Sequence, residues 1–289
     1  MASDKKEAPK ELAVYLKEPG VLQKFTDILG EGAANPYVQS VLIAVADSEE
    51  LRKCTHQSIL QSALRAASLG LSCDPAVKQA WLVPFNKKIK ARGNKPEEWV
   101  KVAQFQPHYM GLYQLAMRTG KYWQINVSPV FDGEQVFEDP IRGMHLVQRE
   151  GSSLLSSPDA ANPAYMRNVT VRRGGSKDRK IIGWIGYFKT KKGFEKTIYM
   201  SIEEIGEHAD RFVKEIGKNQ NWQDSEKRKT MEMKTVLKSL LNWADKSGIV
   251  GHSEQLRKAI KADEGEDILD GVSEDISEET NELKQEENK

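Results

Sequence analysis

The chain has 289 residues, with 43 basic and 42 acidic side chains and a formal net charge of +1. This length allows one large domain or two smaller ones. The longest apolar run, Val41–Ala46, is far too short to cross a bilayer, and residues 1–7 contain no apolar signal region. We therefore expect a cytoplasmic protein without membrane contact. Two cysteines, Cys54 and Cys73, fit a reducing compartment and are expected to be core thiols.

The near-neutral total conceals an asymmetry along the chain. From Ala262 onward, twelve acids and two lysines give a charge of −10, so the rest of the chain carries +11. A basic body with an acidic tail predicts a polyanionic partner and a regulatory or docking tail. A merely solubilising terminus is an equal alternative. We expect a flexible N-terminus over residues 1–13, one folded domain over 14–250 and a flexible acidic tail over 251–289.

The first third of the chain has helical periodicity. Pro19 opens a short helix that Gly30 closes, as proline and glycine often do at helix ends. Pro36 is expected in the first turn of a second helix. Thr55 can cap a third helix, which ends at Gly70. We expect these helices to support the rest of the fold.

The periodicity then changes to that of strands. Residues 79–85 and 99–106 are predicted to form two strands of a β-hairpin, joined by the long, lysine-rich segment 86–98. A helix is expected over Tyr109–Thr119, with Gly120 stopping it. Further short strands are expected at residues 123–130, 165–171, 181–188 and 197–200, and a loop at 150–163.

A final long helix is predicted over residues 224–246. Its apolar residues, among them Val236 and Leu240, should face inward, with Lys227, Lys234 and Lys238 on the opposite side. The elements together predict an α+β fold: N-terminal helices, a β-hairpin, a small antiparallel sheet packed with helices, and a disordered acidic C-terminal tail.

Cations and aromatic rings are concentrated between Lys78 and Lys121. Cations neutralise phosphates and rings stack on unpaired bases, so this composition suits single-stranded nucleic acid. The rings could equally belong to the core, with the lysines on a solvated face. The rings are Trp81, Phe85, Trp99, Phe105, Tyr109 and Tyr113.

The chain lacks the motifs of several enzyme classes. There is no Gly-x-x-x-x-Gly-Lys phosphate loop, and the five histidines and two cysteines have no zinc-site spacing. Two carboxylates near Asp132 could hold Mg²⁺ for phosphodiester cleavage, although turn formation explains Asp132-Gly133 equally well. A nuclease is therefore the rival function. The acids of this cluster are Asp132, Glu134, Glu138 and Asp139.

Three motifs resemble those of the RecT family of phage single-strand annealing proteins. The resemblance begins with Leu-Gly-Leu at residues 69–71 and an aromatic-Leu-x-Pro-Phe strand at 81–85. It continues from the glutamine-containing strand at 104–106 into Tyr-x-Gly-Leu-x-x-Leu-Ala-x-Arg-Thr-Gly at 109–120. A weaker match, with a Lys-Thr pair at 234–235, lies in the late helix. Met110 and Pro107-His108 depart from the family pattern.

The resemblance implies a protein that binds single-stranded DNA and promotes pairing of complementary strands in phage recombination, without ATP or another cofactor. Mg²⁺ would at most modulate DNA binding. The expected partners are single-stranded DNA, the annealed duplex, further copies in a ring or helical filament, a phage 5′–3′ exonuclease and the host single-strand-binding protein through the tail. Residues 14–250 would be the DNA-binding, annealing and oligomerisation domain, associated with the nucleoid of a bacterial host. A passive single-strand-binding protein is a third functional hypothesis.

The strand and helix of the central motif provide the first candidate contacts. Gln104 and Gln106 share a strand face, which we expect to line a groove where Lys101 meets phosphate and the glutamines bond bases or sugars. The alternative is a solvated strand face. Tyr109 is expected to contact DNA, and Tyr113 to pack in the core.

The remaining candidates are cations. Arg118 and Lys121 end the helix after the hairpin and are expected to hold phosphate, unless they only cap the helix carbonyls. Trp81 and Phe85 are expected in the core. The basic hairpin tip, residues 87–92, is left open between DNA and a neighbouring subunit. Lys189, Lys191, Lys234 and Lys238 complete the predicted DNA contacts.

Overall fold

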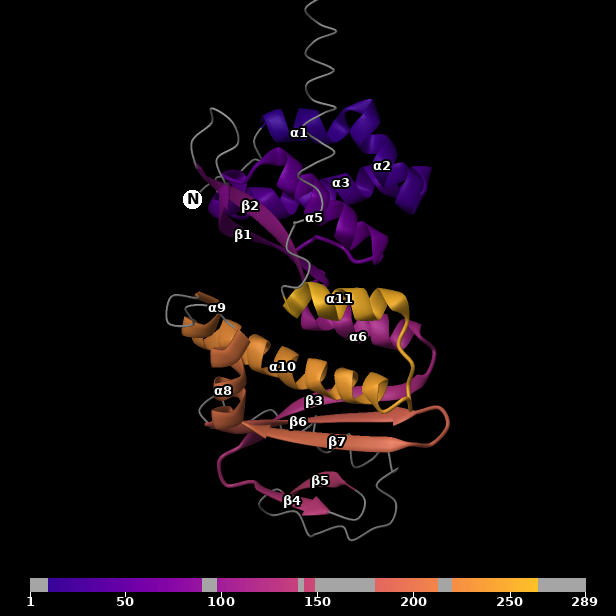
Figure 1. Cartoon of the computed structure of the whole chain (residues 1–289), viewed down its shortest axis with the longest axis vertical. Coiled ribbons are helices and arrows are strands. Elements are labelled where there is room, and N and C mark those ends of the chain that lie inside the picture. The colour runs from indigo at the N-terminus through magenta and orange to yellow at the C-terminus, as the bar shows by residue number, and fades with distance from the viewer. Residues whose placement is uncertain (1–9, 90–97, 140–142, 149–179, 213–219, 265–289) are drawn as a thin grey trace, which may run out of the picture. The chain divides into compact units, whose positions relative to one another are not determined.

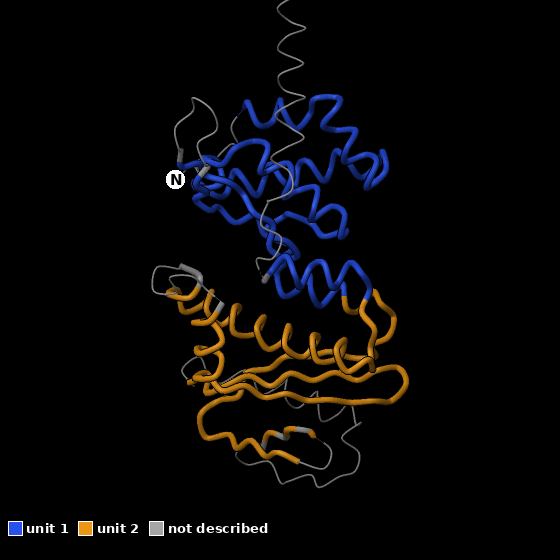
Figure 2. Tube along the Cα trace, in the orientation of Figure 1, with its two compact units in different colours: residues 1–115, 253–289 blue, residues 116–252 orange. Residues whose placement is uncertain are grey.

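The computed structural model describes residues 10–89, 98–139, 143–148, 180–212 and 220–264. These residues form two compact units. Unit 1 comprises residues 1–115 and 253–289, and unit 2 comprises residues 116–252 (Figures 1 and 2). The expected single domain over 14–250 thus contributes to both units. The expected strand at 165–171, the loop at 150–163 and residues 90–92 of the basic hairpin tip lie outside the described residues.

Unit 1 combines helices with one β-hairpin (Figure 1). The hairpin pairs β1 with β2 antiparallel in an unbroken register from Ala80 opposite Pro107 to Ile89 opposite Glu98. Five helices precede it, and two further helices belong wholly or partly to this unit. The elements are α1 (Lys10–Lys17), α2 (Pro19–Leu29), α3 (Glu31–Ala46), α4 (Glu49–Arg52), α5 (His56–Ser68), β1 (Ala80–Ile89), β2 (Glu98–Pro107), α6 (Tyr109–Arg118) and α11 (Glu254–Glu264).

Local chemistry accounts for the ends of α2 and the start of α5. Pro19 opens α2, and Gly30 follows its last residue with a φ of +84°. The Thr55 hydroxyl accepts a hydrogen bond from the N–H of Ser58 and so caps α5. The prediction for Pro36 is wrong, because α3 begins earlier, at Glu31, and contains Pro36 in its interior. There Pro36 has no N–H to offer the carbonyl of Gly32.

The C-terminal boundary also differs from the expected one. Residues 254–264 form α11, in which Leu256, Ala259, Ile260 and Ala262 are buried, and α11 contacts β2. The flexible tail expected from residue 251 therefore includes a packed helix at its start. Local composition hides this helix because its exposed side is strongly charged.

Unit 2 is built on the three-stranded antiparallel sheet β3–β6–β7. Helix α10 packs across one face of this sheet, and the hairpin β4–β5 lies on the other side, where β5 contacts β7 (Figure 1). The elements are β3 (Tyr122–Phe131), β4 (Gln135–Asp139), β5 (Met144–Gln148), β6 (Ile181–Thr190), β7 (Glu195–Ser201), α8 (Ile202–Phe212), α9 (Gln220–Gln223) and α10 (Ser225–Lys246).

The sheet and α10 pack through small and aromatic residues. A Cβ at Gly186 of β6 would lie 3.2 Å from Val236 and 3.3 Å from Leu240, so α10 approaches the sheet closely there. Nearby, the indole N–H of Trp184 donates to Glu232 at 3.0 Å, and Arg228 donates to the other carboxylate oxygen at 2.9 Å. Each oxygen of this buried carboxylate therefore accepts a hydrogen bond.

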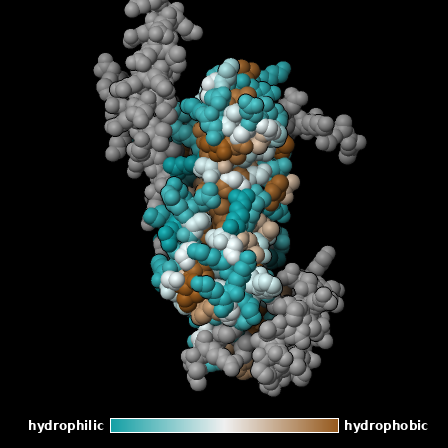
Figure 3. All heavy atoms as spheres, turned by 90° about the vertical axis from the view of Figure 1, so that its right-hand side faces the viewer, coloured by the Kyte–Doolittle hydropathy of each residue, from teal (hydrophilic) through white to brown (hydrophobic). Residues whose placement is uncertain are grey.

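The α+β class predicted from the sequence is confirmed, with small antiparallel sheets packed against helices. Both cysteines are buried thiols, as expected, and burial raises the pKa of Cys73 to about 12. Among the described residues, no helix is both long and apolar enough to cross a membrane. On the face seen in Figure 3, hydrophobic residues reach the surface in several separate patches.

Candidate nucleic-acid interface

The two faces of the hairpin β1–β2 are of different character. On the inner face, Ala80, Leu82, Ala103 and Phe105 are buried. The opposite face, here called the outer hairpin face, has no fully buried residue. By the register and the two-residue period of strands it consists of Trp81, Val83, Phe85 and Lys87 on β1 and Val100, Val102, Gln104 and Gln106 on β2.

Aromatic rings line one end of the outer hairpin face. Trp81 stacks on His108, with ring centroids 5.3 Å apart and planes 21° from parallel. His108 in turn contacts the ring of Tyr109 at 4.5 Å. Trp81 and Tyr109 are both half-buried, so each ring keeps part of its surface accessible.

The expectation that Trp81 and Phe85 belong to the core is not met. Phe85 is 40% exposed and Trp81 is half-buried, both on the outer hairpin face. The helices cover the inner face instead, so strand alternation sends Leu82 inward and these two rings outward. Trp99, on the inner face near the tip, is 67% exposed.

The two glutamines lie beside these rings. Gln106 is directly opposite Trp81, and Gln104 is directly opposite Val83. Directly opposed side chains of an antiparallel pair are close neighbours on one face. A primary amide has both donors and acceptors, so this group can bond bases or sugars without reading sequence. The structure therefore brings Gln104, Gln106, Trp81 and Tyr109 to one region of unit 1.

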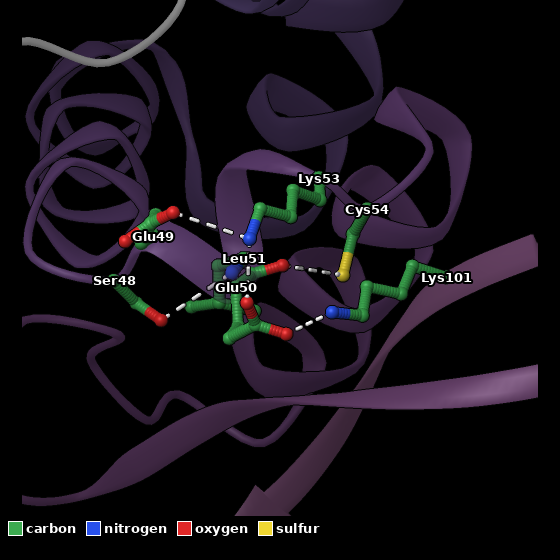
Figure 4. Close-up of polar contacts among 7 residues, drawn as sticks. All are labelled: Ser48, Glu49, Glu50, Leu51, Lys53, Cys54 and Lys101. Atoms are coloured by element: carbon green, nitrogen blue, oxygen red, sulfur yellow. Dashed lines mark hydrogen bonds and ion pairs between the residues drawn. The ribbon is translucent and has the colours of Figure 1, made fainter.

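Lys101 lies apart from the glutamines. It is an odd-numbered residue of β2, so its side chain is on the inner side of the hairpin, opposite to Gln104 and Gln106. There it forms an ion pair with Glu50 of α4, which also pairs with Lys53 at 2.8 Å (Figure 4). Lys101 thus links the hairpin to the helices. Any phosphate at Lys101 would compete with Glu50 for this cation.

Helix α5 holds the hairpin through the free edge of β2. The Ala103 N–H donates to the Ser58 hydroxyl, and the Ser62 hydroxyl donates to the Ala103 carbonyl, both at 2.9 Å. The Thr55 N–H donates to the Lys101 carbonyl at 3.1 Å. Because α5 satisfies these edge groups, the hairpin cannot extend its sheet here, and its outer face is held in a fixed orientation.

Gly111 positions α6 at the base of the hairpin. A Cβ on Gly111 would overlap the carbonyl oxygen of Gln79, which accepts a hydrogen bond from the His108 N–H at 2.9 Å. The first turn of α6 therefore packs directly on the backbone before β1. This close approach requires glycine, and it places His108 and Tyr109 next to Trp81.

The predicted cations of unit 2 form two groups. Lys121 precedes β3, and its carbonyl accepts a hydrogen bond from the Lys191 N–H at 2.9 Å, so these residues are adjacent; both are exposed. Lys189 pairs with Glu195 at 2.7 Å on the sheet face opposite to α10. Tyr187 also donates to Glu195, and burial followed by this negative charge raises the pKa of the Tyr187 hydroxyl.

The second group lies on α10, with Arg118 separate at the end of α6. Lys234 is 5% exposed, although it lies about 200° around the helix from the sheet-facing Glu232. Lys238 is half-buried, whereas Lys227 and Arg118 are exposed. The expected solvated lysine stripe on α10 is therefore interrupted at Lys234.

The acidic cluster that suggested a nuclease lies in the turn after β3 and at the end of β4. No group of three or more potential metal ligands occurs among the described residues. The buried carboxylate of Glu134 accepts a hydrogen bond from the Phe131 N–H at 2.9 Å and so closes the turn after β3. Gly133 in this turn has a φ of +84°, as turn chemistry at Asp132-Gly133 predicts.

Sequence reasoning missed two aromatic positions. His108 was treated only as a departure from a family pattern, and its role as the ring between Trp81 and Tyr109 depends on tertiary packing. Trp123 is the most exposed large hydrophobic residue described, at 69%, although strand alternation places it with the buried Ile125. A β-bulge causes this difference, and no sequence signal marks it.

Comparisons with known proteins identify the family. The model of the RecT family matches residues 37–280, which is most of the chain and includes the outer hairpin face and α10. The uncharacterized protein YqaK of Bacillus subtilis (strain 168) is 29% identical over 261 residues, covering 90% of this chain and 74% of that protein. The chain belongs to the RecT family, a family of phage-type DNA recombination and single-strand annealing proteins.

Proposed function

We propose that this protein binds single-stranded DNA through the outer hairpin face and promotes pairing of complementary strands without nucleotide hydrolysis. The arrangement of Trp81, Gln104 and Gln106 on one half-exposed face is the observation that carries the proposal. Aromatic side chains stack on any base, and amides bond without a fixed sequence preference, which is what annealing of arbitrary strands requires.

Annealing as proposed requires no catalytic centre. Base pairing itself supplies the driving force, so the protein needs only to screen the repulsion between phosphates and keep bases accessible. Stacking on one side of a strand leaves its pairing edges available to a complement. We assign the screening to the exposed Arg118, Lys121 and Lys191 and to the half-buried Lys238. Lys101 and Lys189 would contribute where phosphate displaces them from Glu50 and Glu195. The buried Lys234 would contribute only where DNA binding exposes it.

Annealing without ATP is the direct test of this function. Two complementary oligonucleotides carrying a fluorophore and a quencher are mixed with the full chain, without nucleotide, in several unrelated sequences. We expect pairing well above the spontaneous rate in every sequence. A requirement for ATP would contradict the proposal. Binding that protects single strands but slows their pairing would identify a passive single-strand-binding protein instead.

A nuclease is the rival function from another class. Incubation of end-labelled DNA with the protein and Mg²⁺ separates the two. We expect intact DNA, because Glu134 is engaged in closing its own turn. Mg²⁺-dependent degradation that disappears in Asp132→Asn would support the nuclease.

The assembly and partners belong to the same proposal. We propose that copies of the chain associate side by side on DNA, in a ring or a filament, and receive single strands from a 5′–3′ exonuclease. The acidic tail would contact that exonuclease or the host single-strand-binding protein. Electron microscopy of the protein with sequentially added complementary strands tests the assembly.

A further inference from the structure

Strand β3 begins with an irregularity in its pairing to β6. Tyr122 is opposite Thr190 and Gln124 is opposite Lys189, so two steps on β3 correspond to one step on β6. Trp123 is the extra residue. Such a β-bulge redirects the side chain at the inserted position, and bulges are enriched next to functional sites.

The bulge leaves an exposed ring on a rigid support. The preceding Tyr122 is 1% exposed, its hydroxyl lies 2.7 Å from Nε2 of His252, and its ring meets Phe188 edge-on at 5.6 Å. Ile125, two residues after Trp123, is also buried. The backbone is thus fixed on both sides of Trp123, while the indole itself remains 69% exposed. Exposure of so large a ring forgoes hydrophobic stabilisation that burial would provide.

The other rings at this end of unit 2 are engaged with one another. Phe194 stacks on Trp243 with centroids 5.9 Å apart, Phe188 contacts both, and the Lys196 ammonium lies 5.1 Å from the centroid of Trp243. Within the described part of unit 2, no ring contact involves Trp123. Trp123 is therefore the most exposed ring of the described part of unit 2, and it packs against no other ring there.

Lysines lie near Trp123 along the chain and in the adjoining turn. Lys121 is two residues before Trp123, and the backbone hydrogen bond from Lys191 to Lys121 brings the turn between β6 and β7 alongside. Lys191 and Lys192 in this turn are exposed. Protein–protein contacts are generally depleted in lysine, whereas single-stranded nucleic-acid sites combine lysines with stacking rings. The surroundings of Trp123 thus favour nucleic acid over a second protein chain.

We propose that Trp123 is a base-stacking contact for single-stranded DNA in unit 2, with Lys191 and Lys192 neutralising the adjacent phosphates. This inference rests on the proposed function and adds to it a second stacking position, separate from the outer hairpin face. Unit 2 would then contribute a stacking position of its own to the binding of single-stranded DNA.

Fluorescence anisotropy with a labelled oligothymidine tests the proposal on the full chain. Trp123→Ala is expected to weaken binding by about 5- to 100-fold, the usual cost of removing one stacked ring. Trp123→Phe should restore most of the affinity and Trp123→Leu should not, because the effect requires a ring. Phe137→Ala, which removes another exposed ring of unit 2, is the matched control and should bind as the wild type does.

Three outcomes overturn the proposal. Wild-type affinity of Trp123→Ala, or equal rescue by leucine and phenylalanine, would show that no base stacks on this ring. A change in oligomeric state of Trp123→Ala without DNA, with unchanged affinity for a short oligonucleotide, would assign Trp123 to a subunit contact. Failure of the wild-type protein itself to bind the oligonucleotide would instead refute the proposed function. Because Trp123 is mostly exposed, its variants should melt as the wild type does.

Discussion

The two units present nucleic-acid chemistry in different proportions. The outer hairpin face of unit 1 is mainly neutral, with rings and amides, and its nearest β2 cation, Lys101, is paired with Glu50 on the other side of the hairpin. The region around Trp123 in unit 2 combines this highly exposed ring with the exposed lysines Lys121, Lys191 and Lys192. Stacking and amide bonds tolerate salt, whereas phosphate neutralisation does not. Under the proposed function, unit 1 would mainly bind the bases of the DNA, and unit 2 would mainly neutralise its phosphates.

The two units also differ in which atoms pack against a glycine. A Cβ at Gly111 would overlap the backbone carbonyl of Gln79, whereas a Cβ at Gly186 would meet only methyl groups of Val236 and Leu240 at 3.2 and 3.3 Å. Backbone cannot move aside as side-chain ends can. A side chain added at Gly111 in unit 1 should therefore destabilise the fold more than one added at Gly186 in unit 2.

The largest expected effect follows from this contrast. Gly111→Ala should lower the free energy of unfolding by about 3 kcal/mol or more, and Gly186→Ala by about 1 kcal/mol. Gly32→Ala, in α3 with no atom near the added Cβ, should be neutral or stabilising. Urea unfolding followed by circular dichroism measures all three. A greater loss for Gly186→Ala than for Gly111→Ala would contradict the packing described at the hairpin base.

The second prediction separates base stacking from phosphate neutralisation. Trp81→Ala should reduce affinity for an oligonucleotide by about 5- to 100-fold at every salt concentration. Lys191→Gln should have a smaller effect that grows at low salt, lowering the slope of log K against log salt by about 0.7. Anisotropy titrations across a salt series give both quantities. If Trp81→Ala changes the slope and Lys191→Gln does not, the division of roles between the units is wrong.

Local periodicity predicts much of this fold. The hairpin strands, the helix after them, the strands expected at 123–130, 181–188 and 197–200 and the long helix α10 occur where alternation, capping residues and Gly120 place them. The strands β4 and β5 were not expected. Segments such as α8 and α11 were missed because their charged faces hide the apolar stripe. The N-terminal limit of α3 was wrong because a proline can be accommodated inside a helix.

The candidate site is harder to predict than the fold. Alternation correctly groups Gln104 with Gln106, but which hairpin face is buried depends on where α5 packs, so Trp81 and Phe85 were assigned to the wrong side. The pairing of Lys101 with Glu50 joins residues 51 apart, and the bulge at Trp123 depends on the register with β6. These are long-range features that local spacing does not contain.

The third prediction concerns the acidic tail. Residues 265–289 carry a charge of −8 and follow α11, which contacts β2 of the hairpin. Their removal should strengthen DNA binding several-fold at low salt and have little effect at high salt, because tethered carboxylates compete with phosphate for the same cations. The deletion starts at 265 so that α11 stays intact. Unchanged affinity at low salt would leave the tail as a docking segment for a partner.

The smallest effect is expected at Glu50. Glu50→Gln breaks an ion pair whose members are partly exposed, so it should cost less than about 1 kcal/mol in unfolding free energy. The released Lys101 should raise DNA affinity slightly at low salt. Lys101→Gln is the matched variant and should abolish that gain when combined with Glu50→Gln. A loss of DNA affinity in Glu50→Gln alone would indicate that the ion pair positions the binding face.

Photo-crosslinking tests the central claim most directly. An oligonucleotide with photoreactive thymidine analogues is bound to the full chain and irradiated, and mass spectrometry locates the crosslinked peptides. We predict crosslinks in the peptides that contain Trp81, residues 104–109 and Trp123. Crosslinks confined to α1–α3 or to the hairpin β4–β5, with none at these positions, would contradict the assignment of the outer hairpin face as the DNA-binding surface.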